Sequence, residues 1–263
     1  NVAIGYGAMM DINEGAHANS SADYNIAIGY HALKGAAFAG DDIEVDGNIA
    51  IGSFAMDATA NNEQKYTIAI GYQALTALTS GTVNLAVGFQ ALAANTIGHE
   101  NTAFGYQALY TNVDGDSNTA IGFQSLLVLE PPDGFGANTA VGYKSGDAAT
   151  TASGSVFVGF HAGGTVTTGN DNIAVGNDSM NGAATTGDNN IVIGVSSGHA
   201  LTSGYDNIFM GQSSGAAVST GLLNIGIGRN ALRNTTTGNG IVAVGHDAIS
   251  AGDPDSDTVA FGN

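Results

Sequence analysis

A short, mainly apolar stretch between an asparagine and a glycine recurs along the whole chain. One copy reads Asn101-Thr-Ala-Phe-Gly-Tyr-Gln-Ala-Leu109, and related copies begin at Asn25, Asn84, Asn138 and Asn224. The β-branched and aromatic residues on either side of the alanine favour a pleated strand. The glycine permits a bend with positive φ, or a close approach of another backbone. The pattern therefore predicts one short strand that ends on a glycine in every copy.

The spacing of the central glycines gives the period of the repeat. There are fifteen copies, and nine of the fourteen steps between them are 17 residues long. Helical solenoids have repeats of about 33 residues or more, so a 17-residue unit fits one coil of a β-solenoid. We therefore predict an all-β fold, a parallel β-solenoid (β-roll) of about fifteen 17-residue coils, in which residues 1–263 form a single repeat domain. The central glycines are Gly5, Gly29, Gly52, Gly71, Gly88, Gly105, Gly122, Gly142, Gly159, Gly176, Gly194, Gly211, Gly228, Gly245 and Gly262.

Three further positions of the repeat have restricted composition. Alanine stands two residues before the glycine in eleven copies, and asparagine stands four before it in eleven. Asparagine at a corner can hydrogen-bond nearby backbone and tolerates left-handed geometry, and asparagines stacked coil over coil can form an amide ladder. The third residue after the glycine is Ala or Ser in every complete copy, which predicts a tight inner corner.

The residue directly after the glycine divides the chain into two parts. It is mostly aromatic in an aromatic-ladder part, residues 1–163, and never aromatic in a polar-ladder part, residues 164–263. One interpretation is a stripe of aromatic and amide side chains that binds a glycan or a cell surface. The other, which we favour, is a structural ladder packed inside the rod or between chains. The candidate binding residues are Tyr72, Gln73, Phe89, Gln90, Tyr106, Gln107, Phe123, Gln124 and Phe135.

Four steps of the repeat are longer and place extra residues in 10–24, 34–47, 57–66 and 127–137. Insertions in a solenoid emerge as loops, often on the binding side. The last one is apolar and holds two of the three prolines. We expect Phe135 at the tip of this rigid loop, where it either touches a receptor or folds down onto the rod.

The charge of the chain excludes several partners. Lys and Arg number 5 against 23 Asp and Glu, a net charge of −18. Phosphate binding needs a basic footprint, so no nucleic acid is expected as a partner. No run of 18 apolar residues is present, so no membrane insertion by this segment is expected. The chain begins and stops inside copies of the repeat, and we expect it to be a segment of a longer chain.

The sequence carries no catalytic motif, and no enzyme activity is expected, although a pair of loop carboxylates for glycoside hydrolysis stays open. The chain contains no cysteine, which removes thiolate chemistry. The only candidate cofactor is calcium, because closely spaced carboxylates suit a hard cation. Turn chemistry explains these carboxylates equally well. The candidate ligands are Asp41, Asp42 and Asp46 in one cluster and Asp253, Asp255 and Asp257 in another.

The core string Asn-x-Ala-[Ile/Val]-Gly-x-x-[Ala/Ser] resembles the head repeats of trimeric autotransporter adhesins. The longer string Asn-x-Ala-Ile-Gly-Tyr-Gln-Ala-Leu looks like repeats of phage tail-fibre-type proteins. The adhesin heads are left-handed parallel β-rolls that trimerise, and their unit is shorter than the one found here. The resemblance covers the whole chain and implies a homotrimeric rod.

The resemblance also implies a function. The chain would be a structural, surface-binding fibre segment, extracellular on a virion tail fibre or a bacterial cell surface, and would use repeated side chains for multivalent attachment to a glycan or protein receptor of a host cell. The alternatives are a self-assembling extracellular filament, an ice-binding solenoid and a polysaccharide-degrading tailspike.

Overall fold

The computed structural model of the chain describes residues 1–10, 12, 20–35, 43–58, 63–131 and 134–262. The chain forms two compact units, 1–136 and 137–263. The described residues contain short strands and turns and no α-helix. The strands are β1 (Val2–Ile4), β2 (Ile26–Ile28), β3 (Val45–Asp46), β4 (Ile49–Ile51), β5 (Gln64–Lys65), β6 (Ile68–Ile70), β7 (Leu85–Val87), β8 (Thr102–Phe104) and β9 (Thr119–Ile121) in the first unit, and β10 (Thr139–Val141), β11 (Val156–Val158), β12 (Ile173–Val175), β13 (Ile191–Ile193), β14 (Ile208–Met210), β15 (Ile225–Ile227), β16 (Val242–Val244) and β17 (Val259–Phe261) in the second.

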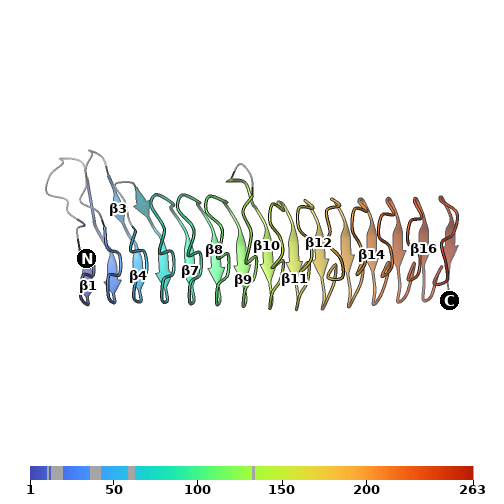
Figure 1. Ribbon diagram of the computed structural model, residues 1–263, viewed down its shortest axis with the longest axis horizontal. Helices are drawn as coiled ribbons and strands as arrows, with labels where there is room; N and C mark the ends of the chain where they lie inside the picture. The colour runs from blue at the N-terminus through green and yellow to red at the C-terminus, as the bar shows by residue number, and fades with distance from the viewer. Residues whose placement is uncertain (11, 13–19, 36–42, 59–62, 132–133, 263) are drawn as a thin grey trace. The chain divides into compact units, whose positions relative to one another are not determined.

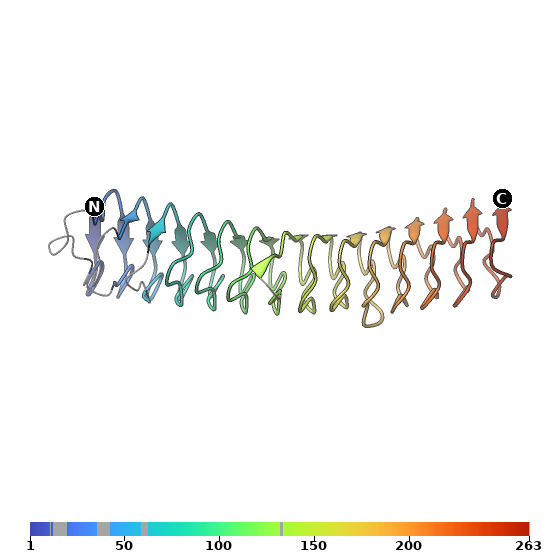
Figure 2. The ribbon, with the colours of Figure 1, turned by 90° about the horizontal axis from the view of Figure 1, so that it is seen from above.

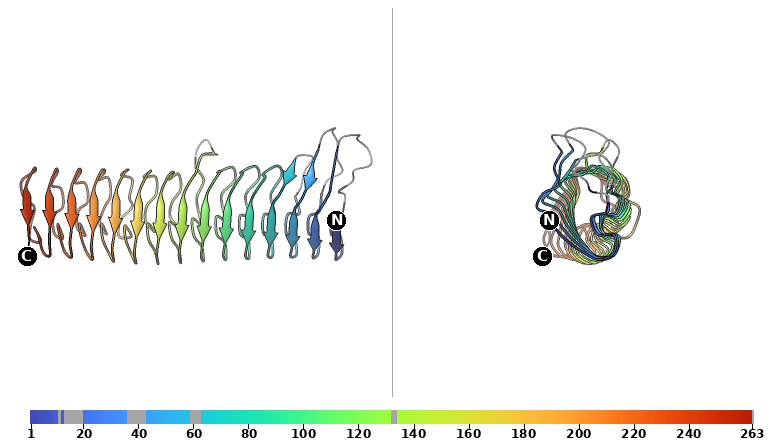
Figure 3. Two further views of the ribbon diagram at one scale, coloured as in Figure 1. Left: turned by 180° about the vertical axis from the view of Figure 1, so that it is seen from behind. Right: turned by 90° about the vertical axis from the view of Figure 1, so that its left-hand side faces the viewer.

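Each unit is built on one parallel sheet in which successive coils add successive strands. In the first unit the order is β1-β2-β4-β6-β7-β8-β9, and in the second it runs from β10 to β17 (Figures 1 and 2). The register joins equivalent positions, so that Ala103 lies opposite both Ala86 and Ala120. Figure 3 shows each coil of the first unit turning once around its core. The predicted all-β parallel solenoid is confirmed.

The central glycine is required because neighbouring coils approach closely at this point. Gly105 has φ +146°, and a Cβ added to it would lie 2.2 Å from the carbonyl oxygen of Gly122. The same overlap with the next coil recurs at Gly71 and Gly88. Any side chain here would separate the coils, so both reasons predicted for the glycine, positive φ and close approach, are confirmed.

The asparagine four residues before the glycine joins two coils across the interior. Asn101 is fully buried, and its Oδ1 accepts a hydrogen bond from the backbone N–H of Asn118 (2.9 Å). Its Nδ2 donates to the carbonyl oxygen of Gly115 (2.7 Å). The predicted ladder therefore exists, but it runs mainly from side chain to backbone. The positive φ at this corner belongs to the residue before the asparagine, such as Glu100 or Ser117.

The core of a typical coil is small. In the coil of Gly105 it contains Ala103 from the strand, Ala108 from the corner and Leu109 after it, all fully buried. Leu109 has φ +51°, and a residue with positive φ stands at the equivalent position of most coils. The predicted tight inner corner, at the third residue after the glycine, is confirmed.

In three coils of the second unit, the strand residue in the core is larger than alanine and the residue after the corner is smaller than leucine. Phe157, Val192 and Phe209 replace the strand alanine, and all three are fully buried. In the same coils glycine replaces the leucine after the corner. A Cβ on Gly215 would lie 2.5 Å from the ring of Phe209, and one on Gly163 would lie 2.2 Å from the ring of Phe157. The glycine therefore makes room for the larger strand residue.

The insertions carry a second, minor sheet. Strands β3 and β5 pair in parallel, with Val45 opposite Gln64. Gln64 is fully buried, and its Nε2 donates to the carbonyl oxygens of Leu78 (3.1 Å) and Thr79 (2.9 Å). The longer coils therefore continue the pairing of the solenoid over part of their extra length.

Candidate functional site

The strands direct two of their three residues away from the core. In β8, Ala103 is fully buried, Thr102 is half-buried, and Phe104 is 54% exposed. The residue before the glycine, here Phe104, is apolar in all fifteen copies. We call this series the outer apolar row. Its members are Ile4, Ile28, Ile51, Ile70, Val87, Phe104 and Ile121 in the first unit and Val141, Val158, Val175, Ile193, Met210, Ile227, Val244 and Phe261 in the second.

The aromatic residues that follow the glycine stack on one another outside the core. Tyr72 and Phe89 have ring centroids 5.4 Å apart, and the next two pairs, through Tyr106 to Phe123, are 5.1 Å apart. The rings are inclined by only 6–14°. We call these four residues the aromatic ladder. Each stacked pair contributes about 0.5–1.5 kcal/mol beyond the area that it buries.

The aromatic ladder is half-exposed, with 39–44% of each residue accessible to solvent. The interpretation that it is packed inside the rod is therefore wrong, because the small alanines and the leucine already fill the interior of these coils. A position between chains stays a prediction. Together, the outer apolar row and the aromatic ladder give the sheet side of the first unit a broad apolar surface.

The four predicted glutamines form a second ladder beside the aromatic one. Gln90 Nε2 donates to Gln73 Oε1 (2.8 Å), Gln107 to Gln90 (3.0 Å) and Gln124 to Gln107 (3.0 Å). All four have left-handed backbones with φ of 52–54°. The amides of Gln90, Gln107 and Gln124 therefore each give one N–H to the preceding glutamine, and Gln73 accepts at the end of the ladder. The structure brings the eight predicted residues of the ladders together in consecutive coils.

The same row continues differently in the second unit. Tyr143 and Phe160 stack at 5.1 Å, and His161 stacks on Phe160 at 4.5 Å. Further on, Arg229 Nε donates to His246 Nε2 (3.0 Å), and both side chains are exposed. The row therefore changes from stacked rings to polar side chains within this unit.

Phe135 lies apart from the ladders. Its backbone forms a parallel bridge with Asp116 in the preceding coil, and its side chain is 66% exposed. Leu129, from the same insertion, is fully buried in the core. Part of the insertion therefore belongs to the solenoid, whereas the ring of Phe135 is accessible to a partner.

The carboxylates proposed for calcium have other hydrogen-bond partners where they are described. Asp46 accepts from the Ser21 hydroxyl (2.7 Å) and the Asp23 N–H (2.6 Å). Asp253 accepts from the backbone and hydroxyl of Thr236, and these bonds lower the pKa of its carboxyl. Asp255 accepts a hydrogen bond from Thr258 through its backbone oxygen (2.6 Å).

The remaining candidate ligands give no further geometry for a cation site. Asp257 donates through its backbone to Asn239 (2.9 Å), and Asp41 and Asp42 lie outside the described residues. Within the described part of the chain, no group of three His, Cys, Asp or Glu side chains is placed to hold a metal ion.

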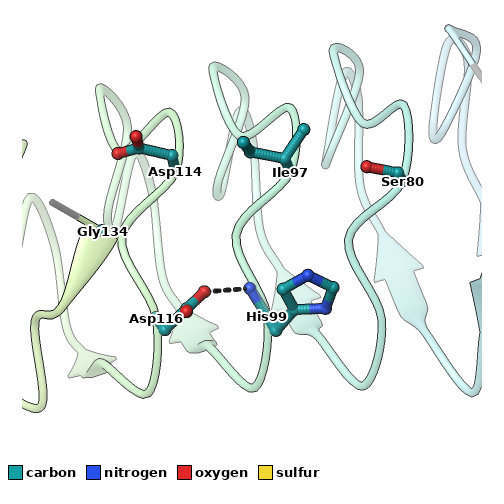
Figure 4. Close-up of a pocket in the computed structure, with 6 residues that line it drawn as sticks. All are labelled: Ser80, Ile97, His99, Asp114, Asp116 and Gly134. Atoms are coloured by element: carbon teal, nitrogen blue, oxygen red, sulfur yellow. Dashed lines mark hydrogen bonds between the residues drawn. The ribbon is translucent and has the colours of Figure 1, made fainter.

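A hollow of about 420 Å³ opens in the first unit, next to the short parallel bridge between Asp116 and Phe135 (Figure 4). His99 donates its backbone N–H to Asp116 (2.6 Å), and its Nδ1 accepts from the backbone N–H of Thr82 (3.1 Å). Burial raises the pKa of Glu130, and its neighbour Asp114 raises it further. Nothing in the pattern of the repeat indicated this hollow, because its lining comes from variable positions. The lining residues are Ser80, Ile97, His99, Asp114, Asp116 and Gly134.

Comparison of the chain with family models, with curated proteins and with solved structures found no match. The described residues form no helix with the length and apolar character needed to cross a bilayer. The fold and the surface therefore define the class. The chain is a parallel β-solenoid repeat protein with a half-exposed apolar and aromatic face.

Proposed function

We propose that the chain is a structural, surface-binding fibre segment that works as a homotrimer outside the cell. The observation that carries this proposal is the half-exposed outer apolar row with the adjoining aromatic ladder. Soluble monomers rarely expose contiguous apolar patches larger than a few hundred Å². A row that presents Ile70, Phe104 and Ile121 to solvent in one unit needs a partner surface.

A second and a third copy of the chain are the partners that fit this surface. The row repeats once per coil, so an identical chain offers an equally spaced row with which it can interdigitate. A single thin coil has too little interior to cover these side chains as well, because alanine, leucine and, in some coils, valine or phenylalanine already fill it. Closed assembly of identical chains would bury the row and leave the opposite sides of the coils available for attachment.

The repetition of the same side chains in successive coils supports the proposed attachment function. Side chains that recur coil after coil can contact a repetitive surface many times, and linked weak contacts raise the overall affinity without any new kind of contact. The net charge of −18 suits a glycan or protein receptor better than it suits nucleic acid. The resemblance to adhesin heads and tail-fibre repeats agrees with attachment to a host cell surface.

Light scattering on a sizing column tests the assembly. We expect a mass three times the 26.2 kDa of one chain. The variant Phe104→Glu should dissociate the assembly, because it places a charge in the outer apolar row. The control Ile97→Glu changes a similarly exposed apolar residue that lies at the turn away from the strands (Figure 4), and it should leave the mass unchanged. A wild-type mass of one chain would refute the trimer.

Binding of the labelled protein to bacterial cells tests attachment separately. We expect saturable binding that exceeds the binding of Phe104→Glu, because the dissociated chain loses avidity. Absence of binding to a panel of cell surfaces and isolated surface polysaccharides would refute the receptor-binding part.

A further inference from the structure

A second hollow opens in the second unit between two successive coils. Its volume is about 340 Å³, which lies at the small end of the range of ligand pockets, about 300–1,000 Å³. The side chains that line it are those of Thr186, Asp188, Asn189, Ser203 and Tyr205. None of them belongs to the outer apolar row or to the aromatic ladder.

The hollow lies where one coil departs from a hydrogen-bond pattern that other coils keep. At this position a side chain usually accepts from the backbone N–H one coil earlier. Asp188 Oδ1 accepts from Asn170 (2.7 Å), and Asn239 Oδ1 accepts from Leu222 (3.0 Å). Tyr205 occupies the position in the coil after Asp188. Among the described residues, the backbone N–H of Asp188 therefore has no acceptor.

The lining combines free polar groups with one accessible ring. Within the described structure, the hydroxyls of Thr186 and Ser203 and the amide of Asn189 make no hydrogen bond. The Asp188 carboxylate has a second oxygen beyond the one that Asn170 uses. Tyr205 is 43% exposed and stacks on no other ring of the described residues. The hollow therefore offers donors, acceptors and an aromatic platform within one small volume.

We propose that this hollow binds one neutral pyranose ring of a surface glycan. A pyranose has hydroxyls that both donate and accept and an apolar C–H face that packs on an aromatic ring. The free Asp188 N–H and the Ser203 hydroxyl suit the sugar oxygens, the Asp188 carboxylate suits a sugar hydroxyl, and Tyr205 suits the C–H face. The inference rests on the proposed function, because it gives the attachment surface a ligand class.

The charge of the lining selects against acidic sugars. No Lys or Arg lines the hollow, and Asp188 contributes a carboxylate. An anionic sugar or a phosphate would meet this carboxylate with no cation to balance it. Neutral hexoses and N-acetylhexosamines are therefore the expected ligands.

The surroundings of the hollow favour a glycan chain over a single sugar. An exposed hydroxyl recurs in five successive coils, spaced by about 4.8 Å per coil, directly before a second glycine of the repeat (Gly169, Gly187, Gly204, Gly221 and Gly238). This hydroxyl row passes through the hollow and continues on both sides of it, so neighbouring sugars could hydrogen-bond along it. The members of the row are Thr168, Thr186, Ser203, Thr220 and Thr237.

The test uses the full chain and saturation-transfer NMR with methyl glycosides of glucose, galactose, mannose and N-acetylglucosamine. We expect transfer to at least one glycoside and an affinity at least tenfold lower for Tyr205→Asn. This variant removes the ring but supplies the acceptor that Asn239 provides elsewhere, so it should fold at least as well as the wild type. The matched control is Tyr66→Asn, at an exposed tyrosine of the first unit outside the ladders, which should keep the glycoside affinity.

Each outcome decides the inference. Absence of transfer to all four glycosides overturns it, and so does equal affinity of Tyr205→Asn and the wild type. An equal loss of affinity in Tyr66→Asn overturns it as well, because the loss would then not depend on the ring in the hollow. If the wild type and Tyr205→Asn bind cells equally well, this subsite is refuted while the proposed attachment function survives. If neither binds any surface, the attachment function itself fails.

Discussion

Phe209 and Gly215 stand where other coils have alanine and leucine, and this paired exchange gives a quantitative test of how side chains pack in the core. Phe209 is fully buried, and its ring occupies the space beside Gly215 and Gly226, where a Cβ would lie 2.5 Å and 3.3 Å from it. Phe209→Ala would remove this ring and leave a cavity, at a cost of about 3–5 kcal/mol in the free energy of unfolding. Gly215→Leu alone would overpack the same space and cost at least about 1–3 kcal/mol.

The double variant Phe209→Ala/Gly215→Leu should recover most of this loss. It recreates the pair formed by Ala103 and Leu109, and Leu109 already adopts φ +51° at the position that Gly215 occupies with φ +60°. A volume-conserving swap usually costs less than about 1.5 kcal/mol. We therefore expect the double variant to be more stable than either single variant.

Urea unfolding, followed by circular dichroism, measures the free energy of unfolding of the wild type, the two single variants and the double variant. The double-mutant cycle then gives the coupling energy between the two sites. Repeat proteins can unfold in parts, so the slopes of the transitions must agree before the free energies are compared. Additive losses in the double variant would refute the reasoning, because they would show that the two side chains do not share one space.

Three further variants test other parts of the structure. Gly105→Ala should lower the thermal unfolding temperature far more than Gly252→Ala does. An added Cβ on Gly105 meets the next coil, whereas one on Gly252 meets nothing within 4 Å. Similar losses in the two variants would contradict the close approach of the coils. Asn95→Leu should raise the free energy of unfolding in urea by about 1–3 kcal/mol, because both side-chain polar atoms of Asn95 are buried without partners. Leu78 fills the same position one coil earlier, so the space accepts a leucine. A lower free energy of unfolding would show that Asn95 has a bound partner. Glu130→Gln should be more stable than the wild type at neutral pH, and this difference should vanish in acid. Burial raises the pKa of Glu130 in the folded state, so the wild type loses stability as pH rises from the unfolded pKa through the folded one; a difference independent of pH would contradict this.

Much of the fold could be predicted because the repeat restricts the same positions in every coil. Stacking similar coils restricts three positions of the repeat. These are the positions of Gly105, of Asn101 and of the small corner residue, each with its equivalents in other coils. Since each coil touches mainly its neighbours, the period alone was enough to predict parallel pairing in register. The sequence does not say which of two adjacent corner residues supplies the positive φ, and the structure places it at the residue before the asparagine.

The candidate site depended on the tertiary structure. Alternation in the strand shows that residues such as Ala103 and Phe104 face opposite sides, but both are apolar, so the pattern does not say which one is buried. Closure of the thin coil decides it, because the space beside Leu109 admits only the alanine, and the larger residue and the aromatic ladder remain outside. The hollow beside Tyr205 likewise needs residues of two coils, 17 positions apart, and a missing acceptor that becomes visible only when the coils are stacked. The sequence by itself determined the period and the residues that each coil requires, whereas packing between coils decided which surface is left for a partner.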